Sequence, residues 1–344
     1  MPDPPDARER ATLLSMIHGY RVSAVLQAAA TLHIADHLAD GPKTGAELAD
    51  VTGADAATLP RILRVLAVLR IIDETEPGCF ALAALGELLR ENAPGSLRRT
   101  AMQVRGDTMR VWGELLHTVR TGETTFDHVH GMSSFDYFAR DPAVSKGFNE
   151  QMGAGTRAAL PAILAAYDFS QFRTIVDVGG GNGTLLAAIL NAHPRATGIV
   201  CDSAAGLAEA PGVLQATGVS ARCRAETIDF FESVPAGGDL YILKSVIHDW
   251  DDARAVTILK NCRGVMPGDG KLVVMEAVVP ARAEASEPAR GIAMADLNML
   301  VNTGGRERTE AEFRELFASS GFAVTRILPT GSPWPLSIIE GAPV

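Results

Sequence analysis

The stretch from Thr174 to Thr184, Thr-Ile-Val-Asp-Val-Gly-Gly-Gly-Asn-Gly-Thr, places the strongest constraint on how this chain can fold. It opens with mostly β-branched residues that predict a short strand, and the apolar run from Leu185 to Leu190 predicts a helix. A strand, a glycine turn and a helix in this order open a nucleotide-binding α/β unit. The glycines allow the backbone to approach a ligand closely, with amide groups near the helix N-terminus directed at it.

The spacing of these glycines indicates which nucleotide binds. A dinucleotide fingerprint, G-x-G-x-x-G, would place its third glycine where this chain has Thr184. The glycines instead stand at 179, 181 and 183, and Asp177 stands two places before the first of them. This loop resembles the S-adenosylmethionine (SAM) loop of class I methyltransferases. A nicotinamide oxidoreductase is therefore a disfavoured alternative.

Composition indicates a globular protein with two domains. The chain has 344 residues, of which 47% are hydrophobic and 21% charged. The net charge of −10 disfavours nucleic acid and anionic membranes as main partners. The four cysteines are scattered and form no C-x-x-C pair, as expected for reduced thiols of a cytoplasmic protein. No apolar run reaches the length of a membrane span.

Residues 1–100 predict a mainly helical, winged-helix-like domain. Met1 to Arg8 is rich in proline and aspartate and is expected to be disordered. The elements expected after it are helices from Leu13 to Leu38, from the capping box at Thr44 to Glu47, and from Asp55 (as cap) to Leu69, and then a hairpin over residues 71–83. A winged helix raises the possibility of a small-molecule-sensing DNA-binding regulator.

The charge of this domain disfavours that regulator. Residues 1–100 carry 13 acidic and 10 basic side chains, so this domain lacks the excess of positive charge that binding a phosphate backbone requires. The helix that would enter a groove offers only Arg61 and Arg64. A dimerisation role is the preferred interpretation.

Residues 101–168 predict a helical linker region that contributes to an acceptor pocket. Large side chains gather here, and some of them could wall a pocket for a flat organic molecule while most pack a core. They are Met102, Met109, Trp112, Phe126, Phe135, Tyr137, Phe138, Phe148 and Met152. Asp127-His128-Val129-His130 could ligate metal only on a strand, and the context predicts a loop, so no metal site is expected.

Residues 169–344 predict a doubly wound, mainly parallel sheet, because β and α patterns alternate. The expected strands run over 174–178, 198–201, 221–225, 240–243, 272–275, 323–328 and 336–339, with helices over 207–216, 253–265 and from 309. Ligands bind at the carboxyl ends of such strands. Asp202 lies at one of these ends, where a carboxylate can accept both ribose hydroxyls, and Asp229 and Phe230 could contact adenine. His248 follows another strand and has the pKa of a general base near neutral pH.

The chain resembles the SAM-dependent O-methyltransferases of the plant caffeate and flavonoid type, and more closely their actinomycete antibiotic-tailoring relatives. The matching stretches are Val176–Gly183, Asp229-Phe-Phe, Leu243-Lys through His248-Asp-Trp-Asp-Asp252, Glu276, Gly304-Gly-Arg-Glu-Arg-Thr309 and Phe148-Asn-Glu-Gln-Met152. This resemblance implies a class I methyltransferase, Rossmann-like, with an N-terminal dimerisation domain and a homodimer. It covers nearly the whole chain.

The resemblance also implies roles for individual residues. His248 would be the general base, flanked by Glu276 and Glu307. The cofactor contacts would be Gly179, Gly181, Asp202, Asp229, Phe230 and Lys244. The acceptor site would contain Trp112, Phe148, Met152, Asn298, Met299 and Asn302. A neutral imidazole would accept the hydroxyl proton during in-line methyl transfer, and no metal is required.

One departure stands out: this family follows its ribose aspartate with Leu-Pro, whereas Asp202 precedes Ser203-Ala-Ala. We expect SAM binding to survive with a differently shaped turn. Some relatives use this fold for pericyclisation or hydroxylation, and a non-methylating enzyme that uses SAM structurally remains the alternative. Retention of His248, Glu276 and Glu307 favours methylation.

Overall fold

The structure, a computed structural model, describes residues 6–104 and 106–344, apart from the side chains of residues 142 and 143. The chain forms two compact units, one up to Arg110 and the other from Val111 to Val344. Over the described residues, no helix combines the length and the apolar character that crossing a membrane requires.

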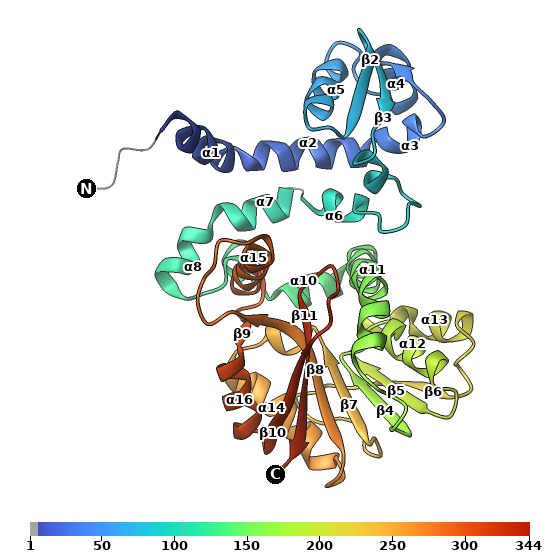
Figure 1. The fold of residues 1–344 in the computed structure, drawn as a ribbon, viewed down its shortest axis with the longest axis vertical. Helices are drawn as coiled ribbons and strands as arrows, with labels where there is room; N and C mark the ends of the chain where they lie inside the picture. The colour runs from blue at the N-terminus through green and yellow to red at the C-terminus, as the bar shows by residue number, and fades with distance from the viewer. Residues whose placement is uncertain (1–5, 105) are drawn as a thin grey trace. The chain divides into compact units, whose positions relative to one another are not determined.

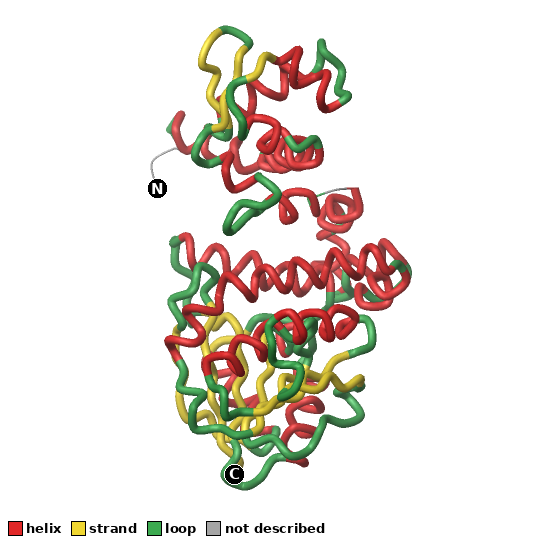
Figure 2. The backbone as a smooth tube through the Cα atoms, turned by 90° about the vertical axis from the view of Figure 1, so that its right-hand side faces the viewer, coloured by secondary structure: helices red, strands yellow, loops and turns green. Residues whose placement is uncertain are grey.

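The first unit combines helices with a three-stranded sheet of order β1-β3-β2 (Figure 2). The predicted hairpin forms β2 and β3, and β1 is a strand that the sequence did not predict. Leu63 and Leu66 on the inner face of its most amphipathic helix, α5, are fully buried, and Val65 and Val68 on the outer face are exposed. Its elements are α1 (Ala7–Ile17), α2 (Gly19–Thr31), α3 (Ile34–Leu38), β1 (Lys43–Thr44), α4 (Gly45–Thr52), α5 (Leu59–Val68), β2 (Ile72–Glu76), β3 (Cys79–Leu82) and α6 (Arg98–Gln103). The helix α7 (Gly106–Gly113) spans the boundary between the units.

Two helix starts in this unit follow side-chain caps. The predicted capping box is confirmed: the Thr44 hydroxyl accepts from the Glu47 N–H, and the Glu47 carboxylate accepts from the Thr44 N–H. Asp6 and Glu9 form a second capping box that starts α1. The prediction that Met1 to Arg8 is disordered is therefore wrong for residues 6–8. Residues 1–5 lie outside the described part of the chain.

Asp55 does not cap the next helix, contrary to the prediction. Its carboxylate accepts the N–H groups of Ala57 and Thr58 and closes a separate turn. The helix then begins one turn later, at Leu59, with Pro60 in its first turn, where a missing N–H has no effect on the helix.

The second unit begins with four helices, α8 (Leu115–Thr121), α9 (Thr125–His130), α10 (Ser134–Arg140) and α11 (Pro142–Ala166). The prediction of a loop at Asp127 to His130 is wrong, because the Thr124 hydroxyl caps α9 and Gly131 ends it in the left-handed conformation. The two imidazoles have separate neighbours. His128 stacks on His117 with ring centroids 3.7 Å apart, and His130 lies 4.5 Å from the ring of Phe126.

A twisted sheet of order β6-β5-β4-β7-β8-β11-β10 forms the centre of this unit (Figure 1). The strands are β4 (Thr174–Val178), β5 (Thr197–Asp202), β6 (Cys223–Thr227), β7 (Leu240–Lys244), β8 (Lys271–Val279), β10 (Phe322–Pro329) and β11 (Leu336–Pro343). The first five of these are parallel to one another, and β11 pairs antiparallel with both β8 and β10. From β4 the chain winds outward to β5 and β6, and then returns to place β7 on the other side. The carboxyl ends of β4 and β7 therefore flank the topological switch point, where such sheets bind ligands.

Helices cover both faces of the sheet (Figure 1). Apolar residues of α11, α12 (Thr184–Ala192) and α13 (Ala210–Ala216) bury one face, and residues of α14 (Asp252–Val265) and α16 (Glu310–Ser319) bury the other. The strands are accordingly apolar on both faces, as a buried parallel sheet requires. The predicted class of doubly wound sheet is confirmed.

Four details differ from the prediction. The third strand, β6, lies two residues further along the chain than expected, and a short 3₁₀ turn (Gly206–Glu209) precedes α13. The helix α15 (Glu287–Asn302) was not predicted, because its sequence has no clear amphipathic period. The two-residue strand β9 (Arg308–Thr309), which pairs with β8, was not predicted either.

Candidate active site

A carboxylate of one strand shapes the turn at the end of the next. β7 ends at Lys244, and the chain then turns through Ser245, whose φ of +55° lies in the left-handed region. Glu276 projects from β8, and its Oε1 accepts the N–H groups of Val246 and Ile247 at 3.0 Å each and of His248 at 3.4 Å. Because this oxygen accepts from three successive amides, it stabilises the turn that carries the histidine.

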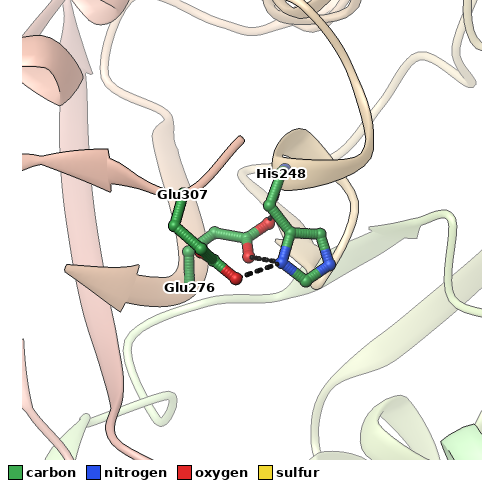
Figure 3. A group of neighbouring side chains, drawn as sticks. All are labelled: His248, Glu276 and Glu307. Carbon is green, nitrogen blue, oxygen red and sulfur yellow. Dashed lines mark hydrogen bonds and ion pairs between the residues drawn. The ribbon is translucent and has the colours of Figure 1, made fainter. Parts of the chain in front are cut away.

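The imidazole of His248 meets two buried carboxylates (Figure 3). Its Nδ1 lies 2.9 Å from Glu307 Oε1 and 3.1 Å from Glu276 Oε2. The side chains of both glutamates are 1% exposed, whereas that of His248 is 18% exposed. Glu307 is held by its backbone, whose N–H donates to Asp296 Oδ1 on α15 at 2.9 Å. With Nδ1 committed to the carboxylates, Nε2 is the ring atom left for a reacting group.

Acidic neighbours dominate the electrostatics of this cluster. Burial lowers the pKa of the His248 imidazole, but Glu276, Asp249 and Glu307 outweigh burial and raise it to about 10. Burial raises the pKa of Glu276 to about 7 and that of Asp249 to about 6, against the opposing charge of His248. At neutral pH the imidazole of the ligand-free protein is therefore protonated.

The glycine turn after β4 lies beside the histidine turn. Gly179, Gly181 and Gly183 all have φ between +54° and +76°. A Cβ on Gly179 would lie 2.6 Å from Val246 Cγ2, so only glycine fits there. The Gly181 N–H donates to Asp202 Oδ2 at 2.9 Å. The predicted glycine and aspartate positions are thus adjacent.

The residues Ser203-Ala-Ala, which replace the Leu-Pro of the family, still hold the Asp202 carboxylate by hydrogen bonds. Asp202 Oδ1 accepts the N–H of Ser203 at 2.6 Å, and the Ser203 hydroxyl accepts the N–H of Gly206 at 3.1 Å. Asn149 of α11 donates to the carbonyl of Ala205 at 2.9 Å, which ties the turn to that helix. Ser203-Ala-Ala therefore forms an ordered turn without proline.

The other residues expected at the cofactor are more dispersed. Lys244 Nζ donates to Ser245 Oγ at 3.2 Å, and burial lowers the pKa of its ammonium group against the charges of Glu276 and Asp177. Asp229 is exposed, and its Oδ1 accepts the N–H of Phe231 at 2.9 Å. The ring of Phe230 lies edge-on to that of Trp250, with centroids 6.0 Å apart.

The residues expected at the acceptor lie on three helices. On α11, Phe148 stacks on Phe138 with centroids 4.9 Å apart, and Met152 is 39% exposed. On α15, Asn302 Nδ2 donates to the backbone and side-chain oxygens of Asn298 at 2.9 Å each.

The remaining two acceptor residues are tied to the same helix, α15. The Met299 carbonyl accepts the N–H groups of Thr303 and Gly304 and so closes the end of α15. Trp112 of α7 packs in a small apolar cluster that includes Val301. Much of its ring therefore contributes to core packing.

Three acids of this region were assigned no individual role from the sequence. Asp249 Oδ1 lies 3.9 Å from His248 Nε2, and its place next to His248 in the chain was a signal for this contact. Asp177 is buried in the glycine motif, where burial raises its pKa to about 7 and its Oδ2 has no hydrogen-bond partner. Asp296, which holds Glu307, carries no local signal in the sequence.

Family comparisons agree with this geometry. The O-methyltransferase domain family matches residues 112–323, and the O-methyltransferase dimerisation domain family matches residues 14–92. The chain belongs to the O-methyltransferase family. Phenazine O-methyltransferase PhzM of Lysobacter antibioticus is 47% identical over 333 residues, covering 96% of each chain. An 8-amino-8-demethylriboflavin N,N-dimethyltransferase of Streptomyces davaonensis is 35% identical over 349 residues, covering 98% of each chain.

Solved structures share the fold over nearly the full length. The crystal structure of LaPhzM has a TM-score of 0.90 and 45% identity, and covers 97% of this chain and 99% of its own. The O-methyltransferase NcsB1 from neocarzinostatin biosynthesis, in complex with SAM and 2-hydroxy-5-methyl naphthoic acid, has a TM-score of 0.83 and 34% identity. The match covers 94% of this chain and 96% of NcsB1.

The unequal bonding of the two glutamates leads to a stability prediction. Glu276→Ala should lower the free energy of unfolding by about 2–4 kcal/mol, because three buried amides lose their acceptor. Glu276→Gln should retain most of the stability, because one acceptor oxygen remains. Glu307→Ala is the matched control. The Oε2 atom of Glu307 has no hydrogen-bond partner, and removal of this carboxylate relieves its repulsion with Glu276. Thermal unfolding should show the larger loss for Glu276→Ala, and equal losses would contradict this assignment.

Proposed function

We propose that the chain methylates a hydroxyl group of a small, aromatic secondary metabolite, with SAM as methyl donor and His248 as general base. The observation that carries this proposal is the bonding of His248 Nδ1 to two buried carboxylates. This bonding orients the ring and leaves Nε2 to accept a proton from the acceptor. The full-length match to enzymes that act on phenazine and naphthoate compounds supports the aromatic acceptor.

The residues at the strand ends fit SAM. An acidic carboxylate, Asp202, is already oriented by backbone amides where ribose hydroxyls would be accepted, and Gly179 and Gly181 keep the turn open for a ligand. Burial raises the pKa of the Asp177 carboxyl group, whose Oδ2 has no hydrogen-bond partner, so a nearby cationic ligand would favour its ionised form. Asp229, Phe230 and Lys244 would complete the site. SAM, when bound, supplies a methyl group on a sulfonium.

The raised pKa of His248 suits the reaction. A neutral imidazole with a protonated hydroxyl and an imidazolium with an oxyanion contain the same number of protons, so both represent one reactive state. The carboxylates around Nδ1 stabilise the imidazolium form and make the ring a strong proton acceptor. An imidazolium beside the bound hydroxyl also lowers the pKa of that hydroxyl. The reactive oxyanion is thereby formed in place.

We further propose that residues 101–168 link the two domains and supply acceptor-pocket walls, with Trp112, Phe148 and Met152 among them, and that Asn298, Met299 and Asn302 line the pocket from α15. Relatives include an N,N-dimethyltransferase, so an amino group is the second candidate nucleophile. Incubation with labelled SAM and a panel of hydroxylated and aminated phenazines, naphthoates and benzoates would identify the acceptor class. Mass spectrometry of the products would separate O- from N-methylation.

The first test of this proposal concerns the base. His248→Ala should slow single-turnover methyl transfer by about 10²–10⁴-fold near neutral pH, while SAM affinity changes little. The deficit should shrink as the pH approaches about 10, because a phenol then ionises without help. Wild-type rates should level off at a lower pH than those of the variant, because the imidazolium lowers the pKa of the bound hydroxyl. A variant as fast as the wild type at pH 7 would refute the general-base role.

The second test concerns the ribose carboxylate. Asp202→Ala should weaken SAM binding by about 1–3 kcal/mol, because the ribose hydroxyls lose a charged acceptor and the Gly181 and Ser203 amides lose theirs. Asp202→Asn should lose less, because one acceptor oxygen remains. Glu226→Ala at the end of β6 is the control, since Glu226 pairs only with the exposed Arg224. Calorimetry showing unchanged affinity in Asp202→Ala would exclude this assignment.

The third test concerns the homodimer. Leu13, Met16, Ile17 and Tyr20 lie at helical spacing and are 52–66% exposed, and this apolar face can pack against a second copy. Leu13→Asp with Ile17→Asp should convert a dimer into a monomer, whereas Leu85→Asp, an exposed position off this face, should not. Analytical ultracentrifugation would measure the change. A wild-type monomer, or a doubly substituted dimer, would contradict the proposal.

A further inference from the structure

Arg308 is a fully buried cation beside the catalytic cluster. Its side chain is 1% exposed, and it follows Glu307 directly in the chain. Its carboxylate partner is Asp252, whose side chain is 60% exposed. Burial of a guanidinium against a mostly exposed partner is unfavourable unless its other N–H groups are satisfied.

The other N–H groups of Arg308 bind the histidine turn. Nη1 donates to the carbonyl of Ile247 at 3.1 Å, and Nη2 donates to the carbonyl of Trp250 at 2.9 Å. Nε donates to Asp252 Oδ1 at 2.9 Å. The planar fork therefore holds the backbone on both sides of His248 and the start of α14. A lysine ammonium cannot reproduce three bonds in this planar arrangement.

The segment that carries Glu307 and the turn that carries His248 also contact each other through their backbones. The Arg306 N–H donates to the His248 carbonyl at 2.8 Å. A Cβ on Gly305 would lie 2.0 Å from that carbonyl oxygen, so the approach requires glycine. The segment that carries Glu307 is thus packed against the turn that carries His248, with Arg308 bonded across the junction.

We propose that Arg308 is a positioning residue that aligns His248 with Glu307. This proposal rests on the proposed role of His248 as base. The side chain of Arg308 bonds to neither the His248 imidazole nor the Glu307 carboxylate. It acts by fixing the backbone segments that carry these two side chains. Catalytic geometry is sensitive to such support, since a misplacement of about 1 Å can slow a reaction about 100-fold.

The test compares Arg308→Lys and Arg308→Met with Arg306→Met, a variant of an exposed neighbour in the same segment. Single-turnover methyl transfer to the fastest acceptor of the panel above would be measured well below each melting temperature. Arg308→Met should be slower by about 10–100-fold with SAM affinity within about twofold of wild type, and Arg308→Lys should recover only part of the rate. Arg306→Met should transfer at the wild-type rate.

A double-mutant cycle separates positioning from general destabilisation. If Arg308 acts through Glu307, Arg308→Met should add at most about a twofold loss to Glu307→Gln, because the alignment is already lost. Proton NMR gives a readout that needs no acceptor: the Nδ1 proton of His248 should shift upfield in Arg308→Lys and stay in place in Arg306→Met. If Arg308→Met does not fold, Arg308→Lys decides by the same two readouts.

The outcomes distinguish this inference from the function on which it rests. Multiplicative losses in the cycle, or an Arg308→Lys variant with wild-type rate and an unshifted proton, would overturn the positioning role while His248→Ala remains slow. A fast His248→Ala would instead overturn the general-base proposal. The NMR shift would still report whether Arg308 aligns the imidazole.

Discussion

The bond between Glu276 and the turn after β7 is the interaction on which the site depends. One oxygen of this carboxylate accepts the amides of Val246, Ile247 and His248, and the other lies 3.1 Å from His248 Nδ1. A single buried side chain thus sets both the backbone of the turn and the orientation of the imidazole. The position of Glu276 is itself fixed, because it lies within β8, in the middle of the sheet.

The cluster around His248 gathers more negative charge than one imidazolium neutralises. Asp249, Glu276 and Glu307 all lie within 4 Å of the ring nitrogens. This arrangement raises the proton affinity of the ring. Strain at Ser245 and the close approach at Gly305 show that backbone conformation is also constrained around His248. The orientation of the imidazole is therefore set before any ligand binds.

Much of the fold follows from local sequence. The glycine spacing, the β-branched runs and the capping box at Thr44 predicted strands, turns and helices that the structure confirms. The predictions were wrong where the same local sequence is compatible with two structures. Asp55 closes a turn where a helix cap was expected. The His-x-His segment was expected to be a loop, but it is helical because Thr124 caps it. The helix α15 was missed because its pattern lacks a clear apolar stripe.

Sequence alone determined that a glycine turn, an acidic strand end and a histidine near a strand end would meet at one edge of a parallel sheet, since that edge is where such strands end. It could name Glu276 and Glu307 only through resemblance. Their convergence on Nδ1 was decided by tertiary structure: β8 pairs with β7 to bring Glu276 beside the turn, and pairs with β9 to bring Glu307 there as well. The contributions of Asp296 and Arg308 were likewise decided by packing, because each acts across a contact between segments distant in the chain.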